Sequence, residues 1–170
     1  MTTSVVPADL RSAVMLLASP SLIRLVTEID DHGSIPPRRL AGTLPDLTSH
    51  HLRRATEAAR AHDLVRDTPG AGLELTPAGA ELADLYDTLG RWARRHAYPL
   101  QVCDFTTRVH HTLGLLTRPR VAEDTDAQPS VRGVPSAEAE QDLVRPRALL
   151  IQWLTGNPQI GALPECESAA

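Results

Sequence analysis

A cluster of positive and protonatable side chains lies between residues 48 and 54, where the chain reads "TSHHLRR". Arginine can donate paired hydrogen bonds to a phosphate or to the major-groove edge of a guanine. Hydroxyl groups and the free N–H groups at the start of a helix can also donate to a phosphate. The cluster is therefore typical of a surface that binds a nucleic acid or another anion.

A plain solvated helix face is the competing interpretation of the same residues. Glu57 follows Arg53 by four positions, so the two side chains can pair on one helix surface. All 17 basic residues are arginines, yet 21 acidic residues leave the 170-residue chain with a formal net charge of −4. This balance argues against a non-specific coat for nucleic acid, but it allows a local basic patch on a sequence-specific binder. On composition alone, we favour the solvated face.

The residue types and their spacing indicate no catalytic or metal-binding chemistry. The histidine pairs at 50–51 and 110–111 are adjacent in sequence, and adjacent side chains point about 100° apart on a helix, so neither pair alone forms a chelate. Cys103 and Cys166 have no zinc-type spacing, and Cys103 is expected to be a small buried apolar side chain. We find no nucleophile triad, paired carboxylates or glycine-rich phosphate loop in a convincing context, and we therefore expect no enzyme, no cofactor and no metal site.

Composition also bears on where the protein works. Apolar residues make up 42% of the chain, which is enough for a core, although aromatic residues make up only 3%. No apolar run has the length needed to span a bilayer, and the N-terminal stretch lacks the basic start of a signal peptide. We therefore expect a cytoplasmic protein with no membrane partner.

The cluster is expected to lie on the last of four consecutive helices. Apolar spacing predicts helices over residues 8–18 and 21–31, the second with Pro20 in its first turn and Gly33 at its end. A short helix capped by Ser34 follows.

The helix that carries the cluster begins at an N-cap, either Thr48 or Ser49. Leu52, Thr56 and Ala59 are spaced to face the interior, which leaves the charged positions to solvent. The segments "HDLVRD", "TPGAG" and "LEL" then predict a strand, a turn and a second strand.

A second helical region follows the predicted hairpin. Thr76 and Pro77 form a typical helix start. An apolar stripe then runs from Leu82 to Leu113, with an interruption at Pro99.

The composition changes beyond this stripe. Residues 118–138 have no apolar period and predict a flexible linker. Residues 139–157 predict a helix with a break near Pro146 and a docking face, and residues 158–170 predict a disordered tail. The docking face consists of Leu149, Leu150, Trp153 and Leu154.

Helices followed by a two-stranded hairpin describe a winged helix-turn-helix, and three segments extend that likeness to a family. They read "GSIPPRRLAGTLP", "LPDLTSHHLRRATEAARAHDLV" and "LELTPAGAEL". In this order they resemble the HxlR-type transcriptional regulators of bacteria, with the MarR-type regulators nearest in shape, over roughly residues 8–97. The chain departs from the family in its short wing without an arginine at the tip, in Asp9 and Leu10 where redox-sensing members carry a cysteine, and in the added region 118–155.

The resemblance implies a mainly α-helical fold with a small β-hairpin wing. A winged helix-turn-helix domain would span residues 1–97, and C-terminal dimerisation helices, the first over residues 98–117, would follow. It also implies a homodimer that binds double-stranded DNA with the helix 48–62 in the major groove. The residues expected to contact DNA are Arg38, Arg39, Thr48, Ser49, His50, Arg53, Arg54 and Arg66.

The apolar stripe is expected to form part of the dimer interface. A lone winged helix does not need a stripe as long as that from Leu82 to Leu113, so this stripe and the first helix are the expected interface. Two-fold symmetry would then space the recognition helices about 34–36 Å apart. A small-molecule effector is a further expected partner, and four aromatic side chains fit either its pocket or plain core, with helical spacing favouring core. These four are Tyr86, Trp92, Tyr98 and Phe105.

The alternative function is a winged-helix protein-interaction module that no longer reads DNA. The small side chains of Thr56 and Ala59 behind the cluster helix, and the short acidic wing, motivate this alternative. In that case the segment from Glu138 to Asn157 either binds a partner or folds back as an intramolecular cover.

Overall fold

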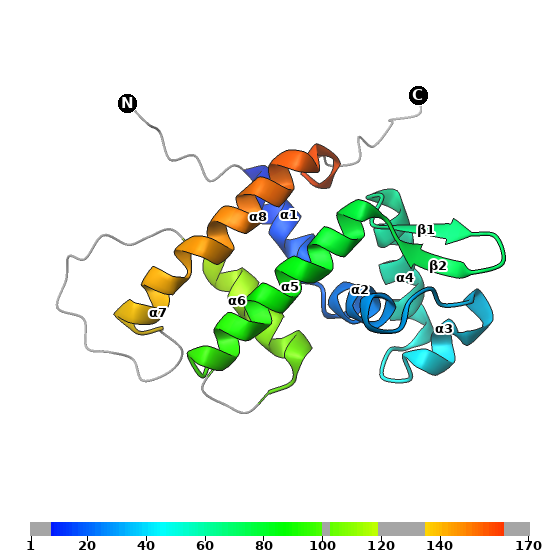
Figure 1. Cartoon of the computed structure of the whole chain (residues 1–170), viewed down its shortest axis with the longest axis horizontal. Helices are drawn as coiled ribbons and strands as arrows, with labels where there is room; N and C mark the ends of the chain where they lie inside the picture. The colour runs from blue at the N-terminus through cyan, green and yellow to red at the C-terminus, as the bar shows by residue number, and fades with distance from the viewer. Residues whose placement is uncertain (1–7, 100–102, 119–134, 162–170) are drawn as a thin grey trace, which may run out of the picture.

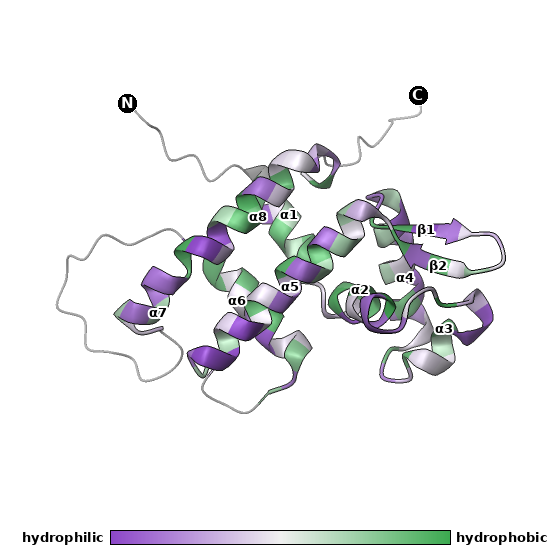
Figure 2. Cartoon of the chain, in the orientation of Figure 1, coloured by the Kyte–Doolittle hydropathy of each residue, from purple (hydrophilic) through white to green (hydrophobic). Residues whose placement is uncertain are grey.

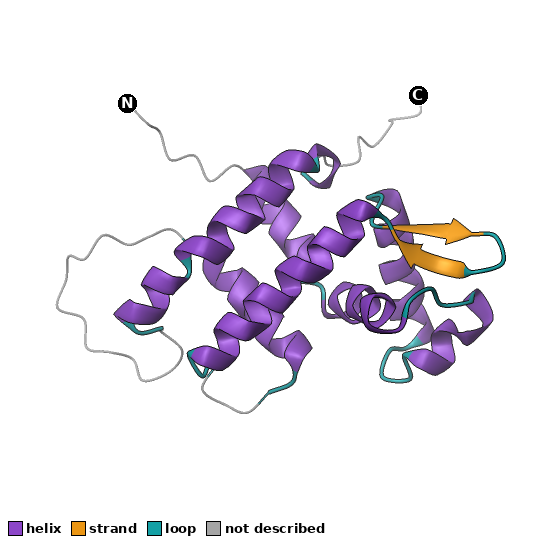
Figure 3. Ribbon diagram, viewed as in Figure 1, coloured by secondary structure: helices purple, strands orange, loops and turns teal. Residues whose placement is uncertain are grey.

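The computed structural model describes residues 8–99, 103–118 and 135–161. Within these ranges the fold is mainly helical, with one two-stranded antiparallel sheet (Figure 3), which confirms the expected helical class with a small hairpin. The elements in chain order are α1 (Ala8–Leu17), α2 (Pro20–His32), α3 (Pro37–Thr43), α4 (Ser49–Ala61), β1 (Val65–Thr68), β2 (Gly72–Leu75), α5 (Pro77–Arg95), α6 (Phe105–Leu116), α7 (Ala137–Asp142), α8 (Val144–Gly156) and the 3₁₀ turn η1 (Pro158–Ile160).

The long helix α5 joins two groups of elements (Figure 1). On one side lie α2, α3, α4 and the β1–β2 hairpin, and on the other lie α1, α6, α7 and α8. α5 begins beside the hairpin and packs against α2, α6 and α8. The cluster helix α4 packs against α2, so α2 connects it to the rest of the core.

Prolines and capping threonines set the starts of α2, α4 and α5 where the sequence predicts them. Pro20 and Pro77 occupy the first positions of α2 and α5, where a missing backbone N–H costs nothing. Thr48 and Thr76 cap α4 and α5, each accepting a hydrogen bond from the backbone N–H three residues later. Gly33 ends α2 with a φ of 79°, as a glycine C-cap should.

The prediction that Ser34 caps the short helix is wrong. α3 begins at Pro37, with Pro36 in the cap position and no side-chain cap. Backbone pairing explains the difference, because Ile35 and Leu73 exchange two N–H···O hydrogen bonds of 2.9 Å. This pairing keeps the chain extended past Ser34, so the helix starts later.

The hairpin depends on one glycine. Val65 pairs with Leu75, and Thr68 pairs with Gly72 at the turn. Gly72 has a φ of 109°, and a Cβ atom there would collide with the backbone of Ile35. Glycine is therefore required for the hairpin to lie against the segment that precedes α3.

The apolar stripe of α5 is buried within a single chain. Leu82, Tyr86 and Leu89 are fully enclosed, as is Leu113 of α6. The Tyr86 hydroxyl donates to the carbonyl of Leu17 at 2.7 Å, which ties α5 to the end of α1. The expectation that this stripe forms a dimer interface is therefore wrong, because α2, α6 and α8 already cover it.

The last two helices fold back along α5 (Figure 1), and the predicted docking face is confirmed. The indole N–H of Trp153 in α8 donates to the carbonyl of Ala78 at 3.1 Å, while that of Trp92 in α5 donates to the carbonyl of Ala139 at 3.2 Å. These bonds tie α8 to the start of α5 and α7 to the second half of α5. Leu150 and Trp153 are both buried.

The predicted break near Pro146 lies three residues too late. α7 and α8 meet at Leu143, which ends one helix and precedes the other. Pro146 lies in the first turn of α8, where a proline is tolerated because its N–H would have no helical partner. α7 also begins inside the predicted linker 118–138, of which residues 119–134 lie outside the described ranges.

Two other boundaries differ from the prediction. The helix expected within residues 98–117 begins only at Phe105, where Asp104 caps it by accepting from the Thr107 backbone N–H at 2.9 Å. The predicted tail starts later than residue 158, because η1 is ordered against the core with Ile160 buried. Residues 162–170 lie outside the described ranges.

No single helix in the described parts of the chain is long and apolar enough to cross a membrane, and the stretch Leu10–Leu17 passes that test only together with α2, across a bend of 61°.

Truncating the buried indole of α8 should destabilise the whole fold. We expect Trp153→Ala to lower the free energy of unfolding by about 3–5 kcal/mol, because it removes a large buried side chain and leaves the Ala78 carbonyl without its donor. The adjacent exposed substitution Gln152→Ala should stay within about 0.5 kcal/mol. Urea unfolding followed by circular dichroism measures both, and equal effects would show that α8 does not stabilise the core.

Candidate nucleic-acid interface

The inner face of α4 is apolar, as the sequence predicts. Leu52, Ala55, Thr56 and Ala59 are buried against α2. The one hydroxyl among them, that of Thr56, donates to the Leu52 carbonyl at 2.8 Å and so is not left unpaired. The buried hydroxyl of this face is therefore satisfied. The larger buried side chains of α2, its leucines and valine, fill the space that the small side chains of α4 leave.

The outer face of α4 carries the cluster. Ser49, His50, Arg53 and Arg54 are all exposed, as predicted. The Arg53 guanidinium lies 3.9 Å from the Glu57 carboxylate, with both side chains about two-thirds exposed or more (70% and 64%). At that separation and exposure the pair holds Arg53 only weakly, so the arginine is free to bind another group.

The two arginines of the cluster point to different surroundings. Arg54 lines a hollow of 340 Å³ between α4 and α1, together with Met15 and Leu16. Arg53 lies on the side of α4 that carries Glu57. Neighbouring positions on a helix diverge by about 100°, which accounts for the difference.

The start of α4 offers further donors. The Thr48 hydroxyl accepts from the His51 backbone N–H at 3.2 Å, so Thr48, and not Ser49, is the cap. Thr48 remains exposed, and Ser49 is the first residue of the helix. The other free N–H groups of the first turn point out of the helix end, where a phosphate can accept them.

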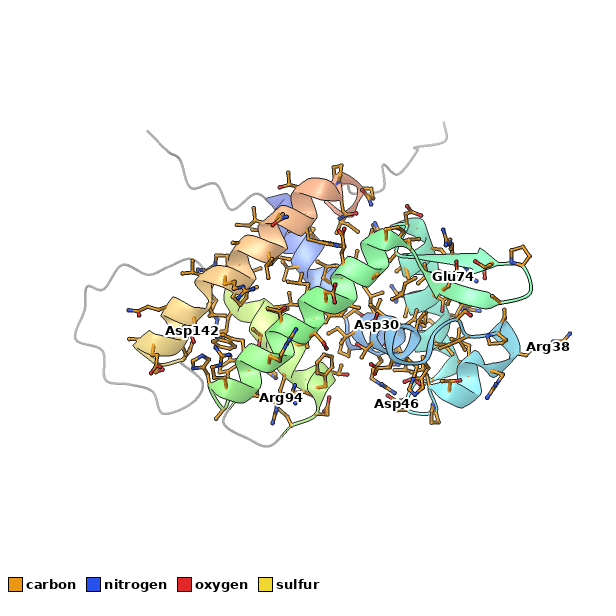
Figure 4. All side chains as sticks on the ribbon, viewed as in Figure 1. Asp30, Arg38, Asp46, Glu74, Arg94 and Asp142 are labelled. Atoms are coloured by element: carbon orange, nitrogen blue, oxygen red, sulfur yellow. The ribbon has the colours of Figure 1, made fainter. Side chains whose placement is uncertain are left out.

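The preceding helix α3 adds two arginines. Arg38 and Arg39 are exposed in its first turn. Arg38 projects from the outer end of α3, away from the other elements (Figure 4), and that end of the helix is hydrophilic (Figure 2). Among the described residues, neither arginine has a carboxylate within ion-pair distance.

A paired arginine fixes the turn between α3 and α4. The Arg24 guanidinium of α2 donates to both oxygens of Asp46, at 2.9 and 3.2 Å, and also lies 3.5 Å from Glu28. The hydrogen bond from Arg24 lowers the pKa of Asp46 and raises the pKa of Arg24. The turn that leads into α4 is therefore held to α2 by a charged pair.

The two arginines nearest the hairpin, Arg60 and Arg66, are also paired with carboxylates. Arg66 therefore differs from the other arginines predicted to contact DNA. Arg66 donates to Glu74 at 2.7 Å across the two strands. Arg60, at the end of α4, donates to both oxygens of Asp67 at 2.8 and 2.9 Å. The pairing of Arg60 with Asp67, seven residues later, was not predicted from the sequence.

The four aromatic residues, for which core was favoured over an effector pocket, do not line one common pocket. Tyr86 is fully enclosed, and Trp92 packs edge-on against Tyr98, with 5.7 Å between ring centroids. Phe105 lines a separate polar cleft of 570 Å³. Core was therefore the better interpretation of Tyr86, Trp92 and Tyr98. Cys103, expected to be buried, is partly exposed.

No group of three or more histidine, cysteine, aspartate or glutamate side chains in the described ranges is placed to hold a metal ion. No protein-family model, curated protein or solved structure matches this chain. The function must therefore be inferred from the residues and their geometry.

Removing the α4 cap should cost a measurable part of the stability. We expect Thr48→Ala to lower the free energy of unfolding by about 1 kcal/mol, because the His51 N–H loses its acceptor. The neighbouring change Ser49→Ala, which removes no cap, should stay within about 0.5 kcal/mol. Chemical denaturation of both variants tests this, and a larger loss for Ser49→Ala would place the cap at residue 49.

Proposed function

We propose that the protein is a winged helix-turn-helix transcriptional regulator that binds double-stranded DNA with α4 in the major groove. One observation carries the proposal. The exposed face of α4 and the start of α3 carry four arginines that are not held by a close ion pair, and among the described residues only Glu57, 3.9 Å from Arg53, lies within ion-pair distance of any of the four. These four are Arg38, Arg39, Arg53 and Arg54.

The order of elements supports the winged-helix part of the proposal. α2, α3 and α4 precede the hairpin, and the bridge between Ile35 and Leu73 adds a third extended segment beside β2. In this arrangement α3 and α4 form the helix-turn-helix and the β1–β2 hairpin forms the wing. The Arg24–Asp46 pair then sets the angle of the turn between the two helices.

Each exposed donor has a role in such a complex. Arg53 and Arg54 reach base edges or phosphates, and His50 contacts either. Thr48 and Ser49 donate to a phosphate at the helix start, while Arg38 and Arg39 contact the backbone that α3 crosses. Arg66 contributes less than expected, because it must first leave Glu74.

A homodimer working in the cytoplasm completes the proposal. Two copies related by two-fold symmetry would read two half-sites about one helical turn of DNA apart. The acidic balance of the whole chain limits binding to unrelated DNA, because repulsion from the phosphates opposes contacts away from the arginine-rich face.

A protein-interaction module without DNA binding is the second candidate, and the hairpin favours it. Both arginines nearest the wing, Arg60 and Arg66, are neutralised by carboxylates. A wing without free positive charge gains little from a phosphate backbone. The segment from Glu138 to Asn157 covers α5 in this chain, so it leaves the exposed face of α4 open to either kind of partner.

Removing the two cluster arginines should weaken DNA binding without unfolding the protein. We expect Arg53→Ala with Arg54→Ala to lower affinity for the DNA upstream of its own gene by about 30-fold or more, since each of the two lost contacts costs about 1–3 kcal/mol. Gel shift or fluorescence anisotropy measures the change. The double variant Arg11→Ala with Arg118→Ala removes the same charge elsewhere and should bind nearly as the native chain does.

Salt dependence should separate the two candidate functions. If phosphates dominate, affinity for DNA should fall linearly on a logarithmic salt scale, with a slope of about −0.9 for each neutralised phosphate. The arginine double variant should have a shallower slope than the native chain. Equal slopes for the two, or no shift of any duplex at low salt by folded protein, would favour the interaction module.

A further inference from the structure

α5 and α8 meet along a line that we call the α5–α8 seam, and two grooves of opposite charge lie on it. The first groove has a volume of 530 Å³ and lies towards the start of α5. Leu85, Leu149 and Trp153 give it apolar walls, while Glu81 and Asp84 supply two exposed carboxylates. No basic side chain of the described residues lines it.

The second groove, of 560 Å³, lies towards the end of α5 and is basic. Arg91, Arg95 and Arg145 line it, with Asp142 as its one acidic residue among those described. Arg95 lies 3.7 Å from Asp142 but is 73% exposed, so it remains accessible. The first groove therefore carries two excess negative charges and the second carries two excess positive charges.

The two grooves are symmetric about a single residue. Thr88 lines both of them. Glu81 precedes Thr88 by seven positions and Arg95 follows it by seven, so the two charges lie about 10 Å on either side along the helix. Asp84 and Arg91 likewise precede and follow Thr88 by four and three positions. A two-fold axis that crosses the seam at Thr88, perpendicular to α5, would place each acidic residue opposite a basic one.

The outer face of α8 fits the same symmetry. Val144, Ala148, Ile151 and Thr155 recur at helical spacing, and all four are exposed and uncharged. Val144 and Ile151 are 54% and 52% exposed, and among the large apolar side chains of the described residues Met15 of α1, at 73%, is the one that is more exposed. Thr88 and Ala148 both line the second groove, so an axis at Thr88 passes near Ala148 and would bring Val144 of one copy towards Ile151 of the other.

We propose that the α5–α8 seam is the interface through which two copies of this chain pair in an antiparallel, two-fold arrangement. A two-fold interface must match its own rotated image, and a face that is acidic at one end, basic at the other and apolar along its edge meets that condition. A partner of single charge would meet repulsion at one of the two grooves. The interface rests on the homodimer in the proposed function, but not on DNA binding.

Two charge-reversed variants of the full chain test the interface. Glu81→Arg with Asp84→Arg, and separately Arg91→Glu with Arg95→Glu, place like charges across the two-fold axis. Each should raise the dimer dissociation constant on the order of 100-fold, because like charges facing each other at an interface are strongly unfavourable. Sedimentation equilibrium at low salt measures the dissociation constants, and circular dichroism verifies that each variant is folded.

Mixing the two variants gives the decisive result. An equimolar mixture should form a heterodimer about as tightly as the native chain pairs with itself, because every reversed charge then faces its opposite. Arg11 and Arg118 are exposed and line neither groove, so the matched control Arg11→Glu with Arg118→Glu makes the same charge change off the seam and should leave pairing unchanged. A native chain that stays monomeric, a charge-reversed variant that pairs normally, or a mixture that stays monomeric would each overturn the proposal. None of these measurements contains DNA, so their failure is distinct from a failure to bind an operator.

Discussion

The burial of the α5 stripe is the constraint on which the rest of the structure depends. A helix of 19 residues with fully enclosed Leu82, Tyr86 and Leu89 needs partners on several sides, and α2, α6 and α8 provide them. The close approach at its start needs Gly79, since a Cβ atom there would collide with the Leu64 carbonyl next to the hairpin. α4 takes its position from α2, which α5 holds in place, and from β1, where Asp67 accepts both hydrogen bonds from Arg60.

The arginines divide into a paired set and an open set, and the division follows the elements. Arg24, Arg60 and Arg66 each hold a carboxylate and brace a turn or the hairpin. The hydrogen bond from Arg60 lowers the pKa of Asp67 below its ordinary value. Exposed pairs of this kind add little stability. Their main effect is on the distribution of charge: near the hairpin and the turn, the arginines that keep their charge unpaired are those of α3 and the outer face of α4.

Local signals explain why much of the fold could be predicted from the sequence. Several predictions depend on residues within one or two turns of each other: the α4 cap at Thr48 or Ser49, the proline start of α5, and the inward set of Leu52, Thr56 and Ala59. What could not be predicted depends on contacts distant in sequence. The prediction that Ser34 caps α3 was wrong because Ile35 pairs with Leu73, 38 positions later.

The same limit applies to the candidate site. The exposed positions of α4 followed from helical periodicity, but the partner of Arg66 depends on strand register, which places it opposite Glu74. The apolar stripe of α5 correctly predicted that this face is buried, but the prediction that a second copy covers it was wrong. Periodicity shows that a face must be covered, but it does not show whether a second copy or a later segment of the same chain covers it.

α8 has one apolar side that is buried and a second apolar side that remains exposed. Its inner side, with Leu150 and Trp153 buried, takes the place on α5 that a second copy was expected to fill. Its outer side keeps Val144 and Ile151 more than half exposed, although a helix on the surface of a monomer normally presents polar residues there. A helix that is apolar on opposite sides is typical of an element packed between two partners. The fold-back of α8 therefore leaves exposed apolar side chains on the outer side of α8, on a different element from the exposed arginines of α3 and α4.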